Sequence, residues 1–291
     1  MDIVGIISPG DMGSAIGKVL GENGMDVVTC LEGRSDLTQL QAEEAGFRIL
    51  PTLNDVVRTA EIVLCVTPPV EALGIAEQVA ASMKTTSATP TYVDCNAISP
   101  GTAQRIGTLM SEAGTTFIDA GIIGPPPGPG RRTRFSCSGL DTAAFEELGT
   151  RGLNIRVVGR EVGQASALKM VYAASTKGSA ALWTELMVAA KALGVGEELA
   201  YEFSLGRSEL AEHYMGEITS MPHRAKRWIG EMEEIAATFQ DVGLTPRIFQ
   251  GVADMFRLVS ETSLADQTSR EPDPPLETVL EVLAKQAQTN H

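Results

Sequence analysis

The sequence lacks the features of membrane, secreted and nucleic-acid-binding proteins. No stretch of eighteen apolar residues is free of charge, which argues against a transmembrane helix. The chain starts with an acid, Asp2, and then an apolar run, whereas a secretory signal needs a basic start and a cleavage site. The net charge of −14 argues against binding a phosphate backbone as a main activity. We therefore expect a cytoplasmic protein with a small-molecule partner, and no nucleic-acid or membrane partner.

Residues that commonly bind metals are also sparse. The four cysteines form no CxxC pair, and the three histidines lie in separate polar segments. Each cysteine falls in an apolar segment typical of a strand: Cys30, Cys65, Cys95 and Cys137. Buried, reduced thiols fit this pattern better than a zinc site does, and we expect no metal.

The first half of the chain alternates short strand-like and helix-like runs, which is the pattern of a parallel sheet covered by helices on both faces. The expected strands span 2–8, 26–31, 47–50, 61–66, 91–95, 116–120, 133–139 and 154–159. The expected helices span 12–23, 37–45, 54–59, 70–83, 100–113 and 142–148. We predict an α/β fold, with a Rossmann-type doubly wound parallel sheet in a dinucleotide-binding domain of residues 1–160.

The second half changes character, and we predict an all-α C-terminal domain of residues 161–291 built on a long helix. Residues 163–193 contain no proline, and such a helix would be about 45 Å long. Apolar residues occur on nearly every face, so we expect it to be buried nearly all round, and a homodimer in which the helical domains pack together. Further helices are expected at 197–217, 222–242, 245–263 and 275–288, with an exposed link at 264–274.

The first strand leads into a turn, S-P-G-D-M-G, that is suited to a dinucleotide. The candidate cofactor-binding residues of this turn are Ser8, Pro9, Gly10, Asp11, Met12 and Gly13. A strand, a glycine turn and a helix together place backbone N–H groups where a pyrophosphate can bind. Ser8 replaces the first glycine of the fingerprint, so the turn must differ somewhat. The alternative is that the glycines serve close packing alone.

A second segment, Gly121 to Gly130, reads GIIGPPPGPG and is too rich in proline and glycine for a helix or strand. It follows an expected parallel strand, and loops at that edge of a sheet often bind ligands. We therefore interpret it as either a rigid loop on the substrate side or a solvated connection.

Several motifs in order resemble the β-hydroxyacid dehydrogenase superfamily, which includes 6-phosphogluconate dehydrogenase and 3-hydroxyisobutyrate dehydrogenase. They are GIISPGDMGSAIG, VTPP from Val66, DCNAISP from Asp94, DAGIIGPPP from Asp119 and GQASALKMVYA from Gly163. The resemblance runs from Met1 to about Leu193. The later run RAKRWIGEMEEIAATFQDVGL is similar to a smaller prokaryotic branch whose C-terminal domain has no settled function.

The resemblance implies further site residues. Cofactor contacts are expected from Val66, Thr67 and Pro68, and from Asn96 near the nicotinamide ribose, although Asn96 would serve equally to cap the turn before Pro100. Substrate contacts are expected from Gly121, Ile122, Ile123 and Gly124. The family's Ser-Gly-Gly is here Ile123-Gly124-Pro125, which removes a hydroxyl that helps to hold a substrate carboxylate. The resemblance therefore implies the reaction class of this protein but does not identify its substrate.

The segment after the second strand, L-E-G-R-S, bears on the choice of cofactor. Glu32 alone would suggest NAD, but the position aligned with the family's acid is Leu31, and Arg34 and Ser35 follow within reach of a 2′-phosphate. We predict NADP, with all three polar residues at the cofactor. The alternative is a solvated loop in which Ser35 caps the next helix.

Lys169 is the one charged residue in the apolar stretch Ala165 to Ala174. The resemblance places the catalytic lysine here, as the general acid or base that exchanges a proton with a substrate oxygen. A lysine paired with a carboxylate is the alternative. The family's asparagine one turn later is Ala173, and Thr176 or Lys177 would supply the missing polar group, so we include these three as substrate-binding candidates.

The sequence therefore predicts an NADPH-dependent dehydrogenase or reductase that interconverts a small hydroxy compound and its carbonyl, with Lys169 as general acid/base. An imine reductase of the same fold is an alternative, although such enzymes usually lack the lysine. A non-catalytic NADP-binding sensor is a third hypothesis, because both the phosphate turn and the substrate segment are altered.

Overall fold

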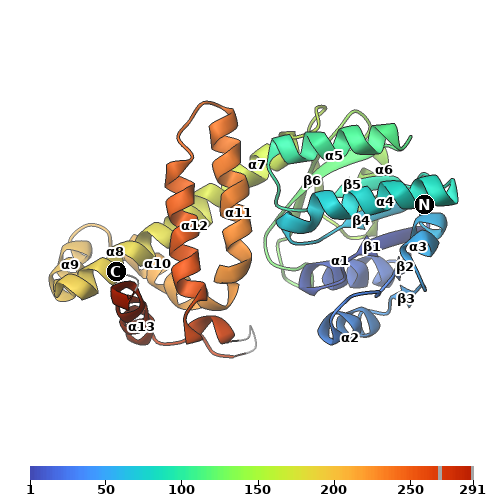
Figure 1. The fold of residues 1–291 in the computed structure, drawn as a ribbon. Coiled ribbons are helices and arrows are strands. Elements are labelled where there is room, and N and C mark those ends of the chain that lie inside the picture. The colour runs from blue at the N-terminus through green and yellow to red at the C-terminus, as the bar shows by residue number, and fades with distance from the viewer. Residues whose placement is uncertain (268–270, 290–291) are drawn as a thin grey trace. The chain divides into compact units, whose positions relative to one another are not determined.

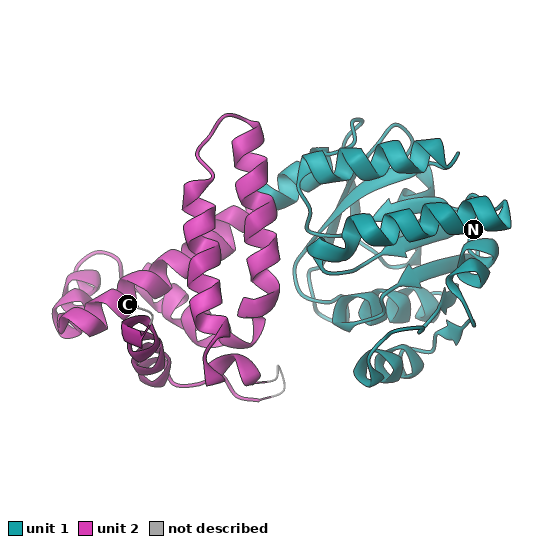
Figure 2. Ribbon diagram, in the orientation of Figure 1, with its two compact units in different colours: residues 1–170 teal, residues 171–291 magenta. Residues whose placement is uncertain are grey.

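The computed structural model describes residues 1–267 and 271–289, and the chain divides into two compact units (Figure 2). The first unit is Met1–Met170 and the second is Val171–His291. The division lies within helix α7 (Gln164–Ala173). The domain boundary that we placed between residues 160 and 161 stays a prediction.

The first unit contains an eight-stranded sheet in the order β3-β2-β1-β4-β5-β6-β7-β8 (Figure 1). Its strands are β1 (Ile3–Ile7), β2 (Asp26–Thr29), β3 (Arg48–Ile49), β4 (Ile62–Cys65), β5 (Thr91–Asp94), β6 (Phe117–Ile123), β7 (Arg134–Ser138) and β8 (Ile155–Gly159). Neighbouring strands are parallel except for β6 and β7, which are antiparallel. The predicted Rossmann-type sheet is confirmed, since the order 3-2-1-4-5-6 is that of dinucleotide-binding domains.

Helices cover both faces of this sheet and enclose two cores. They are α1 (Asp11–Glu22), α2 (Asp36–Glu44), α3 (Leu53–Thr59), α4 (Ala72–Thr86), α5 (Pro100–Glu112) and α6 (Ala143–Glu147). Residues of α1, α2 and α6 fill one core, and residues of α3, α4 and α5 fill the other. Strand β1 serves both, because Val4 and Ile6 face the first core and Ile7 faces the second.

Polar side chains set the starts of several helices. Ser35, Thr52 and Ser99 accept hydrogen bonds from backbone N–H groups in the first turns of α2, α3 and α5. Pro100 occupies the first position of α5, where its missing N–H group has no cost. These three helices follow the parallel strands β2, β3 and β5, so their capped starts lie on the side of the carboxyl edge of the sheet.

The second unit is helical. It holds the end of α7, a π-helical turn (Ala174–Gly178), and then α8 (Ser179–Leu193), α9 (Gly196–Ser204), α10 (Ser208–Ser220), α11 (Pro222–Asp241), α12 (Arg247–Ser260) and α13 (Leu276–Thr289). Helices α11 and α12 run antiparallel and side by side (Figure 1), and ring contacts join Trp228 to Phe256 and Phe239 to Phe249. Among the described helices, none is both long and apolar enough to cross a membrane.

The long helix differs from the prediction in two ways. It runs from Gln164 to Leu193, but a π-helical turn at Ala174–Gly178 interrupts it. Propensity gives no sign of this turn, which depends on packing: Gly178 lies so close to Phe249 that an added Cβ would be 3.2 Å from its ring. Burial all round is also wrong for the single chain, because Leu182 and Leu193 are 53% and 75% exposed.

Other element boundaries also need correction. The predicted loop 121–130 begins later, since residues 121–123 complete β6 by pairing with β7. The predicted helix 197–217 is two helices, because the chain turns at Gly206 between α9 and α10. Helix α12 ends at Ser260, and a short 3-10 turn (Ser263–Asp266) follows, with Leu264 buried. Part of the predicted link 264–274 lies outside the described residues.

Candidate nucleotide and substrate site

The parallel strands β1 to β6 end at one edge of the sheet, and most of the predicted site residues lie at the ends of five of them. Strand β1 leads to Ser8, β2 to Glu32 and its neighbours, β4 to Val66 and β5 to Asn96, while β6 ends in the predicted substrate segment. Strands β1 and β4 are adjacent, so the strand order reverses between them. In open α/β sheets, ligands bind at the carboxyl edge where this reversal occurs.

The phosphate turn keeps a tight geometry despite the missing glycine. Ser8 has φ +64°, a left-handed conformation that favours glycine, and its carbonyl accepts a hydrogen bond from the N–H group of Gly10 at 2.9 Å. Gly13 faces this carbonyl so closely that a Cβ would lie 2.6 Å from the oxygen. The turn therefore requires glycine at position 13, while Ser8 itself adopts a left-handed backbone.

The start of α1 is arranged for an anion. Gly10 precedes the helix, cannot cap it with a side chain, and has no described atom within 4 Å of where its Cβ would lie. The first N–H groups of a helix favour negative charge, and here a phosphate has room to approach. Asp11 is turned toward α2, where its carboxylate accepts a hydrogen bond from Gln41 at 2.5 Å. Pro9 is buried and Met12 packs partly against the core.

Residues after β2 include both a capping side chain, Ser35, and a partly exposed cation, Arg34. Ser35 caps α2, since its Oγ accepts a hydrogen bond from the N–H group of Thr38 at 3.3 Å. The Arg34 guanidinium lies 3.9 Å from the Glu71 carboxylate, with 22% of its side chain exposed. Burial raises the pKa of the Cys30 thiol, and the charge of Arg34 opposes this rise. Glu32 is exposed.

Asn96 joins the ends of β4 and β5. Its side chain is 3% exposed: Oδ1 accepts a hydrogen bond from the Thr67 N–H group at 2.6 Å, and Nδ2 donates to Asp94 at 3.0 Å. Asn96 thus fixes the backbone of the segment Val66 to Pro68. The capping role before Pro100 belongs to Ser99 instead. Contact of Asn96 with a ribose stays a prediction.

The substrate segment contributes backbone more than side chains. Gly121, Ile122 and Ile123 are buried in β6, and the Ser136 hydroxyl donates a hydrogen bond to the Gly121 carbonyl at 3.2 Å. Gly124 is exposed with φ +120°, and a Cβ there would lie 2.9 Å from the Arg132 carbonyl oxygen. Thr133 Oγ1 closes the proline-rich loop by donating to the Pro125 carbonyl at 2.7 Å.

Lys169 lies directly against this segment. A Cβ added to Gly121 would be 2.9 Å from the Lys169 Cβ, so only the missing side chain of Gly121 lets α7 approach β6 this closely. Lys169 is half-buried on a helix that we expected to be buried nearly all round, and its neighbour Leu168 is 41% exposed. The site at the end of β6 therefore combines a close backbone contact with a lysine that has access to solvent.

Sequence reasoning missed Asp119 and Ser166. Asp119 lies on β6 with no exposed surface, and it accepts hydrogen bonds from the N–H group and the hydroxyl of Ser166 in the first turn of α7. A carboxylate inside a buried strand was the available signal, because such a group must be bonded. From the sequence, we included Asp119 only as the first residue of the motif DAGIIGPPP.

The remaining predicted residues lie in the helical unit, where each has local contacts. Ala173 is buried, and the Thr176 hydroxyl donates to the carbonyl of Ala173 in its own helix at 3.3 Å. Lys177 forms a salt bridge with Glu231, which is 7% exposed, and its Nζ lies 5.0 Å from the centre of the Trp228 ring. Their roles at a substrate stay predictions.

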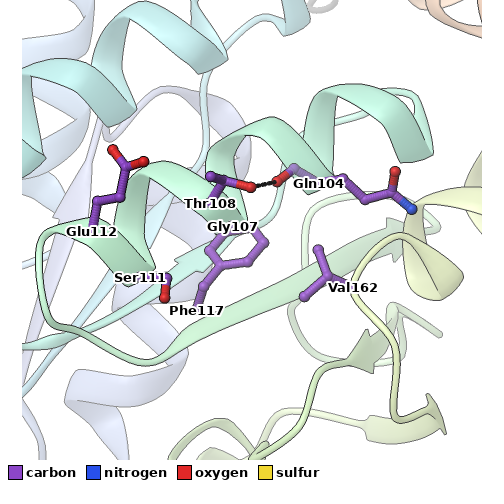
Figure 3. Close-up of a pocket in the computed structure, with 7 residues that line it drawn as sticks. All are labelled: Gln104, Gly107, Thr108, Ser111, Glu112, Phe117 and Val162. Carbon is purple, nitrogen blue, oxygen red and sulfur yellow. Dashed lines mark hydrogen bonds between the residues drawn. The ribbon is translucent and has the colours of Figure 1, made fainter.

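A hollow on the first unit lies away from these residues. It has a volume of about 450 Å³ and is lined by α5, Phe117 and Val162 (Figure 3). Gln104 and Thr108 border it, and the Thr108 hydroxyl donates to the Gln104 carbonyl at 3.1 Å. None of the predicted cofactor or substrate residues lines it.

Comparison with known proteins identifies the two parts of the chain separately. Residues 3–150 match the NAD binding domain of 6-phosphogluconate dehydrogenase, and residues 190–259 match a domain of unknown function. An uncharacterized 28.5 kDa protein from Methanothermus fervidus is 29% identical over 260 residues, which are 89% of this chain and 99% of that protein.

Solved structures extend the similarity over the whole chain. A conserved protein of unknown function, described as structurally similar to 3-hydroxyacid dehydrogenases, is 31% identical with a TM-score of 0.68, covering 91% of this chain and 100% of that one. The 3-hydroxyisobutyrate dehydrogenase of Mycobacterium tuberculosis has a TM-score of 0.70 at 16% identity, covering 97% and 99%. An imine reductase from Myxococcus stipitatus has a TM-score of 0.57 at 18% identity, covering 99% of each chain. The last two show the fold alone.

Proposed function

The chain belongs to the family defined by the NAD-binding domain of 6-phosphogluconate dehydrogenase, and we propose that it is an NADPH-dependent oxidoreductase interconverting a small hydroxy compound and its carbonyl. The family indicates a nicotinamide dinucleotide cofactor. The observation that carries the proposal is the close approach of Lys169 to Gly121 at the end of β6. That approach brings a proton-carrying side chain to the edge of the sheet where such cofactors bind.

The residues of the phosphate turn fit the cofactor. The open start of α1 at Gly10 suits a pyrophosphate, and Gly13 keeps the turn clear of side chains. When bound, a nicotinamide dinucleotide supplies hydride to a carbonyl carbon or accepts it from the corresponding alcohol. The role of Lys169 is to give a proton to the carbonyl oxygen as the hydroxyl forms, and to take it back in the oxidation direction.

The preference for NADPH rests on Arg34. Its contact with Glu71 spans 3.9 Å between partly exposed groups, and exposed ion pairs of this kind contribute little to stability. Arg34 can therefore exchange Glu71 for a 2′-phosphate at small cost, and a guanidinium binds phosphate in a bidentate way. Ser35 caps α2, and its hydroxyl also lies 3.1 Å from the Thr38 hydroxyl. When Thr38 is the donor of that pair, Ser35 can donate its hydroxyl hydrogen to the same phosphate.

A homodimer is proposed for the second unit. Leu182, Leu186 and Leu193 form an apolar stripe along α8 and are 53%, 45% and 75% exposed. Their spacing of four and seven residues matches one seam of a helix that packs against another helix. Exposed leucines in this register are typical of a surface that a second copy covers.

The experiment is a steady-state measurement of NADPH oxidation over a panel of small aldehydes and ketones, with and without a carboxylate, and of cyclic imines. NADH is assayed in parallel. We expect oxidation of NADPH with at least one carbonyl compound and slower oxidation of NADH. Turnover of imines alone would favour the imine reductase, and NADPH binding without turnover of any compound would favour a sensor.

A further inference from the structure

Asp119 is a fully buried carboxylate whose hydrogen bonds converge on the helix that carries Lys169. Its Oδ2 accepts from the N–H groups of Gly163 at 2.9 Å and Ser166 at 3.0 Å, and its Oδ1 accepts from the Ser166 hydroxyl at 2.5 Å. The Ser138 hydroxyl donates to Oδ2 at 3.0 Å and in turn accepts from the Ala165 N–H group at 3.0 Å. One carboxylate and one serine thus bind three N–H groups at the start of α7.

These N–H groups are ones that a helix cannot bond internally. The first turn of a helix leaves its N–H groups without intrahelical partners, and side-chain acceptors usually come from residues just before the helix. Here the acceptor comes from a strand more than forty residues earlier in the chain. The bonds therefore fix the position of α7 on the sheet as well as capping it.

Asp119 and Gly121 act on the same face of β6. Side chains alternate along a strand, so residues 119 and 121 both face α7. Asp119 holds the first turn of the helix, and Gly121 admits the next turn, where its missing Cβ leaves room for Lys169. These two contacts constrain the height and the rotation of Lys169 over the strand.

We propose that Asp119 is a positioning residue for Lys169. Through Ser166 and Ser138, Asp119 holds α7 so that the lysine lies at the end of β6. The proposal rests on the proposed function in one respect only, which is the effect of this placement of Lys169 on catalysis. An isolated buried carboxylate destabilises a protein, so Asp119 needs compensating hydrogen bonds. It receives them from Gly163 and Ser166 at the start of α7 and from Ser138 on β7. Catalysis is sensitive to displacements of about 1 Å in a group such as Lys169.

The test is trace labelling of lysines with acetic anhydride, read by mass spectrometry of the peptides. It reports the reactivity of Lys169 without any substrate, and the exposed Lys18 and Lys84 serve as internal references. In Asp119→Asn, an amide N–H group would face the helix N–H groups in place of one acceptor. We expect labelling of Lys169 to rise by about threefold to thirtyfold, the range that corresponds to loss of a helix cap, with Lys18 and Lys84 unchanged.

Asp141→Asn is the matched control, because Asp141 accepts a hydrogen bond from the Ala143 N–H group at the start of a different helix, α6. It should leave the labelling of Lys169 unchanged. Ser166→Ala removes one hydrogen-bond donor to Asp119 and should give a smaller rise in the labelling of Lys169. It provides the test if Asp119→Asn does not fold. Unchanged Lys169 labelling in a folded Asp119→Asn or in Ser166→Ala would overturn the proposal.

A second readout separates this proposal from the proposed function. With the carbonyl compound that turns over fastest in the panel, Asp119→Asn should lower kcat while the Kd of NADPH stays the same. In a Lys169→Met background, Asp119→Asn should cause no further loss, because both act through one group. Full activity of Lys169→Met would contradict the proposed function alone, whereas additive losses would contradict the role of Asp119.

Discussion

Arg34 is the residue on which the proposed preference for NADPH depends. Arg34→Ala should weaken NADPH binding by about 1.5–3 kcal/mol, the usual contribution of a hydrogen bond to a charged group. NADH binding should hardly change, because NADH has no 2′-phosphate. Both Kd values can be measured by fluorescence titration of the reduced nicotinamide.

The matched control for Arg34 is Arg58→Ala. Arg58 is an exposed arginine paired with Asp55 in α3, away from the carboxyl edge of the sheet. Its removal should leave both Kd values as they are. Equal losses of NADPH and NADH affinity in Arg34→Ala would show that Arg34 supports the fold of the turn and not the 2′-phosphate.

The buried thiols give a pH dependence at the scale of single residues. Burial, and then the charge of Asp94, raises the pKa of Cys65 to about 12, while burial raises the pKa of Cys137 to about 12. The thiols of the unfolded chain ionise at their ordinary pKa, about 8.5. The folded state therefore holds protons that the unfolded state loses as pH rises from about 8.5 toward 12, and the stability that these thiols contribute falls over that window.

We expect the free energy of unfolding to decline above about pH 8.5, with each such thiol contributing up to about 1.4 kcal/mol per pH unit. Cys65→Ala should make the decline shallower than in the unsubstituted protein. Urea denaturation at pH 7, 9 and 10 measures the difference. Identical slopes for the two proteins would show that the Cys65 thiol is not held in its neutral form.

At the residue scale, some of the site residues can be predicted from the sequence and others cannot. The phosphate turn, Lys169 and the segment at Gly121 are recognisable because their residue types recur at characteristic positions along the chain. Asp119 is not, because its partners at residues 138, 163 and 166 become neighbours only when β6, β7 and α7 pack together. Ser8 shows a third case: the turn was expected to change, yet the serine adopts the left-handed backbone of glycine.

At the scale of elements, the Lys177–Glu231 pair holds the π-helical turn to α11. Both side chains are largely buried, and Lys177 also lies over the Trp228 ring. Glu231→Ala would leave the lysine cation buried beside that ring without its carboxylate. We expect a loss of about 3–5 kcal/mol in the free energy of unfolding, measured by urea denaturation.

The double substitution Lys177→Met with Glu231→Leu is the control for this loss. It replaces the pair by apolar groups of similar size and should recover most of the stability, since buried ion pairs are often replaced at little cost. A loss below about 1 kcal/mol in Glu231→Ala would mean that water reaches Lys177, as it does at exposed pairs.

Element boundaries were predicted where local chemistry sets them. Caps at Ser35 and Ser99 and the proline at the start of α5 place the helices of the first unit within a few residues of their predictions. The π-helical turn was missed because helix propensity does not indicate it, and the break near Gly206 was missed because this glycine was included in one predicted helix instead of ending it. Residues 121–123 were assigned to a loop on composition, although pairing with β7 makes them part of a strand.

At the scale of the whole molecule, the exposed stripe on α8 predicts self-association. We expect light scattering at micromolar concentration to give the mass of a dimer, twice the 30.8 kDa of the chain. Leu182→Glu combined with Leu186→Glu places charges in the stripe and should shift the mass toward the monomer. A stable monomer of the unsubstituted protein at that concentration would contradict the homodimer.

The central claim is that Lys169 exchanges a proton with the substrate oxygen, and Lys169→Met tests it most directly. Methionine keeps the apolar stem and the helix propensity but removes the proton. The measurement is kcat for NADPH oxidation with the best carbonyl compound of the panel, alongside the Kd of NADPH and the free energy of unfolding. Lys18→Met, on the exposed side of α1, is the control.

We expect kcat of Lys169→Met to fall by ~10² to 10⁴, as for the loss of a general acid. The Kd of NADPH should stay the same, because Gly10, Gly13 and Arg34 are unaltered, and the stability should hold. Turnover at the unsubstituted rate in a folded Lys169→Met protein would contradict the account, because the proton would then come from another group.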